Sequence, residues 1–203
     1  MAAPAGHVHL YHRSMASLAD LTRAASIFDL RLSSVTAAHW AAPSTCEGWA
    51  VKDLADHVTG GNRFAVSLLA GSDAETAFTN ALAPGFEGEP LSQYRESASA
   101  QSEAFARSGA LSATVDHPSG KIDGGTFLGL RVGDLVLHGW DLARSTGGDD
   151  SLDDELVVAV WEAYAPRLAR LGPSGMFGAG ASGAVRDDAS LAVRLLDATG
   201  RRP

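Results

Sequence analysis

The run from Phe127 to Ser145 constrains the fold of this chain more than any other segment. It is apolar on most sides, which is typical of a buried, central helix. Two ionisable residues, Asp134 and His138, lie four positions apart within it. On a helix this spacing puts both side chains on one face, with their Cβ atoms about 5–6 Å apart. Because burying either group unpaired costs several kcal/mol, the sequence predicts that both have partners.

A metal ion would satisfy both groups, and His57 is the best candidate for a third ligand. Two imidazoles and one carboxylate leave coordination positions open for water or substrate, whereas structural zinc sites use four protein ligands. Zinc is the first choice, and the same donor types also serve nickel or ferrous iron. The structural alternative is that the histidines are satisfied core residues and that Asp134 pairs with Arg131. Spacing alone leaves both interpretations open.

Length and composition are those of a folded protein with a sizeable core. The chain has 203 residues, and we expect a single domain over residues 1–203 with a flexible tail over residues 1–13. A formal net charge of −8 argues against a nucleic-acid partner. No apolar run approaches the length of a membrane span and no secretory signal is visible, so we expect a cytoplasmic protein without membrane contact.

The pattern of apolar residues predicts an all-α fold. Spacings of three and four residues predict five helices and a short final one, which we place at Ser14–Ala38, Ala50–Ala70, Leu91–Ser108, Phe127–Ser145, Asp153–Leu171 and Asp187–Thr199. We expect residues 71–90 to form a loop and residues 111–125 to form a small β-hairpin that turns at Pro118. The glycine-rich segment 172–183 is either a lid or a linker.

Several residues near the predicted ligands have two interpretations. Gly61, four residues after His57, leaves that helix face bare, either for a ligand or for a neighbouring helix. Asp141 and Arg144 are expected to form an intrahelical ion pair rather than to orient a ligand. We expect the single cysteine, Cys46, to be a small structural residue. The tryptophans of the two central segments, Trp49 and Trp140, are expected in the core.

Two segments resemble a known family. Residues 42–57, APSTCEGWAVKDLADH, are similar to the (A)PTPCxxWxVxDLxxH signature of the mycothiol-dependent maleylpyruvate isomerase family, which belongs to the DinB-like superfamily. Residues 130–144, LRVGDLVLHGWDLAR, resemble the second signature of this family, which ends in HGWDLAR. The closing residues 195–201, LLDATGR, resemble an actinobacterial branch of the family.

The resemblance implies both a fold and a chemistry. The fold would be a DinB-like up-down four-helix bundle with extra C-terminal helices. The metal would be held by His57, Asp134 and His138, the residues that spacing had already selected. Mycothiol would be a co-substrate, activated as a metal thiolate that attacks an electrophile, as in a thiol-dependent S-transferase or isomerase. The partners would be a small-molecule thiol and an electrophilic substrate, with a homodimer as one option for the assembly.

The sequence also departs from the family pattern. The family isomerase carries glutamate where this chain has Asp134, and it has a further C-terminal domain that contributes a catalytic arginine. Few residues follow the expected helix Asp153–Leu171, so we expect that domain to be absent or reduced. Two alternative functions therefore stay open. One is a metal-dependent hydrolase that uses bound water, and the other is a non-catalytic module that binds a metal or a ligand.

Overall fold

The structure is a computed structural model that describes residues 16–168, 177 and 180–203. The predicted tail over residues 1–13 lies outside these residues. So does most of the glycine-rich segment 172–183, whose role as a lid or a linker stays open.

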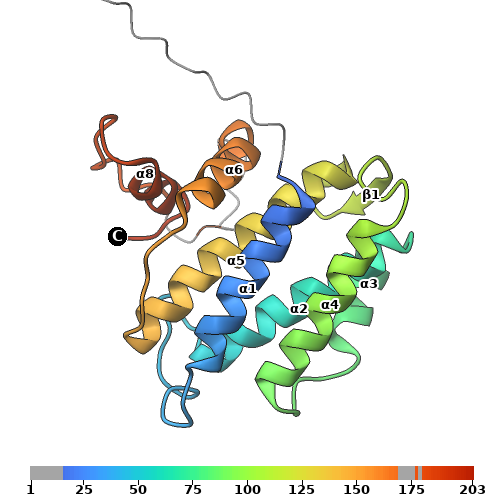
Figure 1. Cartoon of the computed structure of the whole chain (residues 1–203), viewed down its shortest axis with the longest axis horizontal. Coiled ribbons are helices and arrows are strands. Elements are labelled where there is room, and N and C mark those ends of the chain that lie inside the picture. The colour runs from blue at the N-terminus through green and yellow to red at the C-terminus, as the bar shows by residue number, and fades with distance from the viewer. Residues whose placement is uncertain (1–15, 169–176, 178–179) are drawn as a thin grey trace, which may run out of the picture.

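Four helices form the predicted bundle (Figure 1), and they are α1 (Leu18–Ser33), α2 (Val51–Leu69), α4 (Pro90–Ala106) and α5 (Gly124–Thr146). Both α1 and α2 pack against α4 and against α5. Their apolar stripes meet in one core, in which the fully buried side chains include Phe28, Leu54, Val58, Phe105, Leu128, Val132 and Leu135. The all-α prediction is therefore confirmed, and the long helices agree with their predicted positions to within a few residues.

Helix α5 is the central element, as the sequence predicted. Asp123 caps its first turn by accepting a hydrogen bond from the backbone N–H of Thr126 at 2.8 Å. Gly147 ends the helix in the left-handed conformation, with φ of 70°, which glycine adopts at little cost. Within the helix, a Cβ atom on Gly133 would lie 2.5 Å from the ring of Tyr164, so this glycine lets a neighbouring helix approach closely.

Helix α1 is shorter than the predicted helix Ser14–Ala38. It begins at Leu18 because Ser17 and Asp20 form a capping box, in which each side chain accepts a hydrogen bond from the backbone N–H of the other residue. It ends near Ser33, where the hydroxyls of Ser33 and Ser34 donate to carbonyl oxygens of the last turn. Hydrophobic periodicity does not detect such local caps.

The loop predicted over residues 71–90 is wrong, because this segment contains α3 (Ala74–Leu82). Asp73 caps the helix by accepting a hydrogen bond from the backbone N–H of Thr76 at 2.7 Å. The buried face of α3 consists of small residues, Ala77 and Ala81, and it packs on α2. Helix α3 and the segment after it return the chain along the bundle, so that α2 and α4 run in the same direction (Figure 1).

The predicted hairpin is present and connects α4 to α5. Strands β1 (Thr114–His117) and β2 (Gly120–Asp123) pair antiparallel, with Val115 opposite Ile122. The turn lies at Pro118 and Ser119, as expected. Since β2 ends where α5 begins, the hairpin fixes the start of the central helix.

The C-terminal region adds helices outside the bundle, as predicted. Helix α6 (Asp154–Tyr164) continues into a short 3-10 turn, η1 (Ala165–Arg167), and packs on α5. Helix α8 (Leu191–Ala198) packs on α6. It begins later than the predicted helix Asp187–Thr199 because Ser190 caps it. Among the described residues, no helix has both the length and the apolar character needed to cross a membrane.

Candidate metal centre

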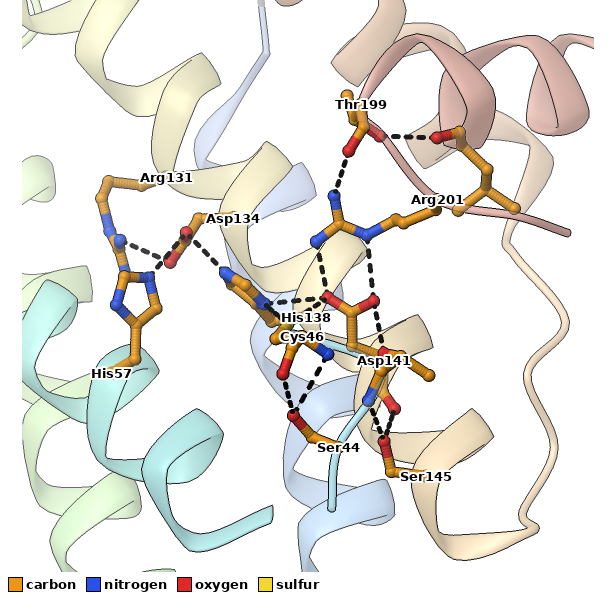
Figure 2. Close-up of polar contacts among 12 residues, drawn as sticks. Ser44, Cys46, His57, Arg131, Asp134, His138, Asp141, Ser145, Thr199 and Arg201 are labelled. Atoms are coloured by element: carbon orange, nitrogen blue, oxygen red, sulfur yellow. Dashed lines mark hydrogen bonds and ion pairs between the residues drawn. The ribbon is translucent and has the colours of Figure 1, made fainter. Parts of the chain in front are cut away.

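The structure brings the three predicted ligands together. His57 on α2 and His138 on α5 both point their Nε2 atoms at the same oxygen of Asp134 (Figure 2). The distances to Asp134 Oδ1 are 3.4 Å from His57 and 3.5 Å from His138. The imidazole rings meet edge to face with their centroids 4.8 Å apart. The three donor atoms all lie within 4.8 Å of one another.

The second oxygen of Asp134, Oδ2, forms an ion pair with Arg131. The guanidinium Nη1 donates to Asp134 Oδ2 at 2.7 Å, while Nε and Nη2 of the same group donate to Gln101 and Asn62 at 2.8 and 3.0 Å. Burial alone would raise the pKa of Asp134, but the charge of Arg131 and the two imidazoles hold that pKa well below its usual range. The carboxylate is therefore ionised, with Oδ1 aimed at His57 and His138. The predicted pairing with Arg131 and the predicted convergence with the histidines are both present.

The helix face beside His57, which Gly61 leaves without a side chain, is occupied by Arg131. A Cβ atom on Gly61 would lie 2.4 Å from Nη1 of Arg131. The space is thus filled by an arginine of α5, which decides between the two interpretations in favour of the neighbouring helix. The absence of a side chain at Gly61 is what lets Arg131 reach Asp134.

His138 is held on its other side by Asp141. Asp141 Oδ2 lies 2.9 Å from His138 Nδ1, so Nδ1 carries the hydrogen that Asp141 accepts, and Nε2 is the ring atom that faces Asp134. The expected ion pair between Asp141 and Arg144 is wrong. Arg144 instead pairs with Asp150 at 2.6 Å, because its side chain lies on the exposed face of α5 while Asp141 lies on a buried one.

Asp141 is itself the centre of a buried polar cluster that spacing did not predict. Arg201, from the segment after α8, donates through Nε to Oδ1 at 3.0 Å and through Nη2 to Oδ2 at 2.5 Å. Thr45 donates to Oδ1 at 2.9 Å. Burial raises the pKa of Asp141, but the hydrogen bond from His138 and the charge of Arg201 outweigh burial and lower the pKa to about 2. No local sequence pattern could have predicted the contact between Arg201 and Asp141, since the two residues lie sixty positions apart.

Cys46 also faces this cluster. Its thiol donates to Asp141 Oδ2 at 3.5 Å, and Sγ lies 3.9 Å from His138 Nδ1. Burial, together with the charge of Asp141, raises the pKa of Cys46 to about 12, so the group stays a thiol at neutral pH. Cys46, His138 and Asp141 form a second set of potential ligands. That set fits a metal less well, because Arg201 already neutralises Asp141 and His138 Nδ1 carries a hydrogen.

Two tryptophans differ in their roles. Trp140 is buried, as expected. Trp49 is only half-buried, and its ring lies against both imidazoles, with centroids 4.9 Å from His57 and 6.1 Å from His138. The side chain of His57 is 42% exposed, so the site opens to solvent on the α2 side.

More than half of the chain matches a known protein family. Residues 21–143 match the family model of the mycothiol maleylpyruvate isomerase N-terminal domain. The chain belongs to this family. Two uncharacterized proteins of Mycobacterium tuberculosis, from strains CDC 1551 / Oshkosh and H37Rv, are each 36% identical to it over 151 residues, which is 74% of this chain and 77% of theirs. All three candidate ligands lie within the matched residues, and Arg201 lies outside them.

Solved structures show that the fold is that of the same family. The crystal structure of the mycothiol-dependent maleylpyruvate isomerase has a TM-score of 0.58 and 19% identity, over 70% of this chain and 65% of that one. The structure of a histidine-to-alanine mutant of that enzyme has a TM-score of 0.61 and 18% identity, over 81% of this chain and 72% of that one. The chain thus spans slightly less than two thirds of the first of these structures.

Proposed function

We propose that this protein binds one divalent metal ion through His57, Asp134 and His138 and acts as a thiol-dependent isomerase or transferase. The thiol is mycothiol, which the family name supplies, and the co-substrate is a small electrophile. The observation that carries the proposal is the placement of Asp134 Oδ1 against two imidazole Nε2 atoms.

The donor distances support a shared cation better than direct hydrogen bonds. Two donors that each lie about 2.1 Å from a tetrahedral zinc ion are about 3.4 Å apart. The separations of 3.4 and 3.5 Å between Asp134 Oδ1 and the two Nε2 atoms match that value. A hydrogen bond from nitrogen to oxygen is usually shorter, at about 2.7–3.2 Å. Imidazole donors make zinc the first choice, with nickel and ferrous iron as the alternatives.

The surrounding charges favour an anionic ligand at such a centre. Arg131 already balances the charge of Asp134, and imidazole ligands are neutral, so the charge of a bound cation would be largely uncompensated. When bound, a divalent metal ion supplies the positive charge that deprotonates a coordinating thiol near neutral pH. Cys46 does not compete for this role, because its pKa is raised to about 12.

The chain's own residues would orient the donors and limit the access of water. Arg131 and Asp141 fix the orientations of Asp134 and His138, which reduces the reorganisation that metal binding requires. The ring of Trp49 covers part of both imidazoles, while the exposed edge of His57 leaves a route for a thiol and its partner.

Metal analysis tests the ligand assignment. Protein purified without a histidine tag is expected to hold about one divalent ion per chain, and His138→Ala is expected to lose it, because the remaining pair of ligands binds too weakly to survive purification. His39→Ala is the matched control, since His39 contacts Thr36 and belongs to neither potential ligand set. Full metal occupancy in the His138→Ala protein would show that the ligands are assigned wrongly.

Turnover assays test the chemistry. A panel of electrophiles that includes maleylpyruvate would be incubated with the metal-loaded protein, with and without mycothiol, and again after chelation. We expect turnover that needs both the thiol and the metal. Turnover without thiol would instead support the hydrolase, and no turnover under any condition would support the binding module.

A further inference from the structure

The segment that follows α8 reaches back to the metal centre through one side chain, Arg201. Its backbone N–H donates to the carbonyl of Leu196 at 2.8 Å, and Nη1 donates to the carbonyl of Thr199 at 3.0 Å, which fixes the residue on the end of α8. Its other two nitrogens form the paired contact with Asp141 (Figure 2). The side chain of Arg201 is only 12% exposed.

Asp141 connects Arg201 to the predicted ligand His138. The carboxylate is 2% exposed and needs both a counter-charge and a full set of hydrogen bonds. Among the described residues, Arg201 is the arginine or lysine whose ion pair with Asp141 supplies that charge. Two parallel N–H donors on the two oxygens prevent the carboxylate from rotating, and Thr45 holds Oδ1 as well. Oδ2 is therefore fixed where it accepts from His138 Nδ1.

We propose that Arg201 is a positioning residue for the metal centre. It acts through Asp141, whose fixed carboxylate sets the tautomer and the ring orientation of His138, so that Nε2 faces Asp134 Oδ1. This inference rests on the proposed metal site. It extends the site beyond residues 21–143, which match the family domain, into the C-terminal segment.

The alternative role of Arg201 is simply to anchor the C-terminal segment. Other contacts already do this. Leu195 and Leu196 are buried, and Gly200 packs closely against the carbonyl of Phe177. Arg202 bonds to Asp197 at 3.4 Å and to the carbonyl of Gly180 at 3.1 Å. Arg202 therefore offers a matched control, since it lies in the same segment, carries the same charge and does not contact Asp141.

Zinc affinity, measured by competition with a chromogenic chelator, separates the two roles. Arg201→Ala is expected to raise the zinc dissociation constant about 10- to 100-fold, the usual cost of losing a residue that orients a ligand. Arg202→Ala is expected to stay within about threefold of the wild type, because it leaves the ligand untouched. Equal dissociation constants for these two variants would overturn the proposal. Arg201→Lys keeps the charge but not the two-pronged contact, so its affinity is expected to lie between those of Arg201→Ala and the wild type.

A double-mutant cycle tests whether Arg201 acts through Asp141. In an Asp141→Asn background, Arg201→Ala is expected to cause little further loss of zinc affinity, since the group that it positions has already been altered. A full and additive effect of Arg201→Ala in that background would overturn the proposal. If Arg201→Ala fails to fold, Arg201→Lys replaces it in the cycle, and a wild-type affinity for Arg201→Lys would contradict the role of the paired contact.

A metal-free measurement keeps this inference separate from the proposed function. Long-range ¹H–¹⁵N NMR correlations of the histidine rings at pH 8 report the tautomer of His138. We expect the Nδ1–H tautomer in the wild type and in Arg202→Ala, and a mixture of tautomers in Arg201→Ala. A wild-type protein that binds no divalent metal ion would overturn the proposed function, and the NMR result would still decide the role of Arg201. The same tautomer in Arg201→Ala as in the wild type would overturn that role.

Discussion

Among single residues, Asp134 makes the contacts of two interpretations that the sequence had presented as alternatives. A carboxylate has two oxygens, and here each has a separate task. Oδ2 pairs with the buried Arg131, and Oδ1 faces the two imidazoles. The ion pair would not compete with the proposed metal, because it fixes the direction in which the free oxygen points.

The burial of His117 predicts that the protein loses stability as the pH falls. Burial, with ring contacts to Phe64 and Phe127, lowers its pKa from 6.5 to about 4, and the charge of Arg131 acts in the same direction. Because the pKa is lower in the folded protein, the unfolded chain binds the proton more tightly. The stability that depends on neutral His117 is therefore fully present above about pH 6.5 and is lost as the pH falls towards 4.

Urea denaturation of the metal-free protein between pH 7 and pH 4 checks this expectation. The free energy of unfolding of the wild type should fall over this range, and that of His117→Gln should fall less steeply. The lowered pKa values of Asp134 and Asp141 also remove stability as the pH falls below about 5, but both proteins contain these carboxylates, so the difference between the two curves reports His117. Identical pH dependence in the two proteins would contradict the assigned burial of the ring.

At the scale of elements, α5 carries a polar stripe through an otherwise apolar helix. Arg131, Asp134, His138 and Asp141 follow one another at spacings of three, four and three residues, so they share one face. Three of these residues were considered together as ligands or partners in the sequence, whereas Asp141 was assigned to Arg144. The stripe is the signal that could have placed Asp141 beside His138.

Substitutions at the two adjacent glycines of α2, Gly60 and Gly61, are predicted to differ in their effects on stability and zinc affinity. Gly61→Ala should gain helix propensity by about 1 kcal/mol, yet its Cβ atom would displace Arg131, whose buried hydrogen bonds cost more to break. We expect a net loss of about 1–2 kcal/mol in the free energy of unfolding and at least about a tenfold loss of zinc affinity.

Gly60→Ala is the matched control for this substitution. Its Cβ atom would meet only the ring of Phe86, at 3.4 Å, which is an ordinary contact. We expect unchanged zinc affinity and up to about 1 kcal/mol of added stability. Denaturant unfolding and chelator competition measure both quantities, and equal behaviour of the two variants would show that Arg131 does not depend on the space at Gly61.

At the scale of the whole molecule, the proposed metal would link two helices through ligands 77 positions apart in the sequence. An ion that binds only the folded state stabilises it by mass action, by about 2.7 kcal/mol at a free concentration one hundred times the dissociation constant. For a chain of this length, that corresponds to a rise in Tm of about 5–10 °C. Differential scanning fluorimetry with zinc and with a chelator measures the shift. His57→Ala should abolish it, and a full shift in that variant would exclude His57 as a ligand.

Interactions between residues that are close in sequence account for the local features of this protein. The long helices, the hairpin and the spacing of Asp134 and His138 follow from periodicity and turn chemistry, which act between residues a few positions apart. His57 was already the candidate third ligand, and the family resemblance supported it through a signature that is also continuous in sequence. Helix α3 was missed because its buried face is made of alanines, which give a weak apolar signal.

The way in which these features combine depends on contacts between residues that are distant in sequence. Arg131 fills the space at Gly61, Trp49 lies against the two imidazoles, and Arg201 reaches Asp141 across sixty positions of sequence. None of these contacts has a local pattern, because each depends on which helix faces pack together. A buried carboxylate must take its counter-charge from whatever cation the packing brings near, and in this fold the C-terminal segment supplies it.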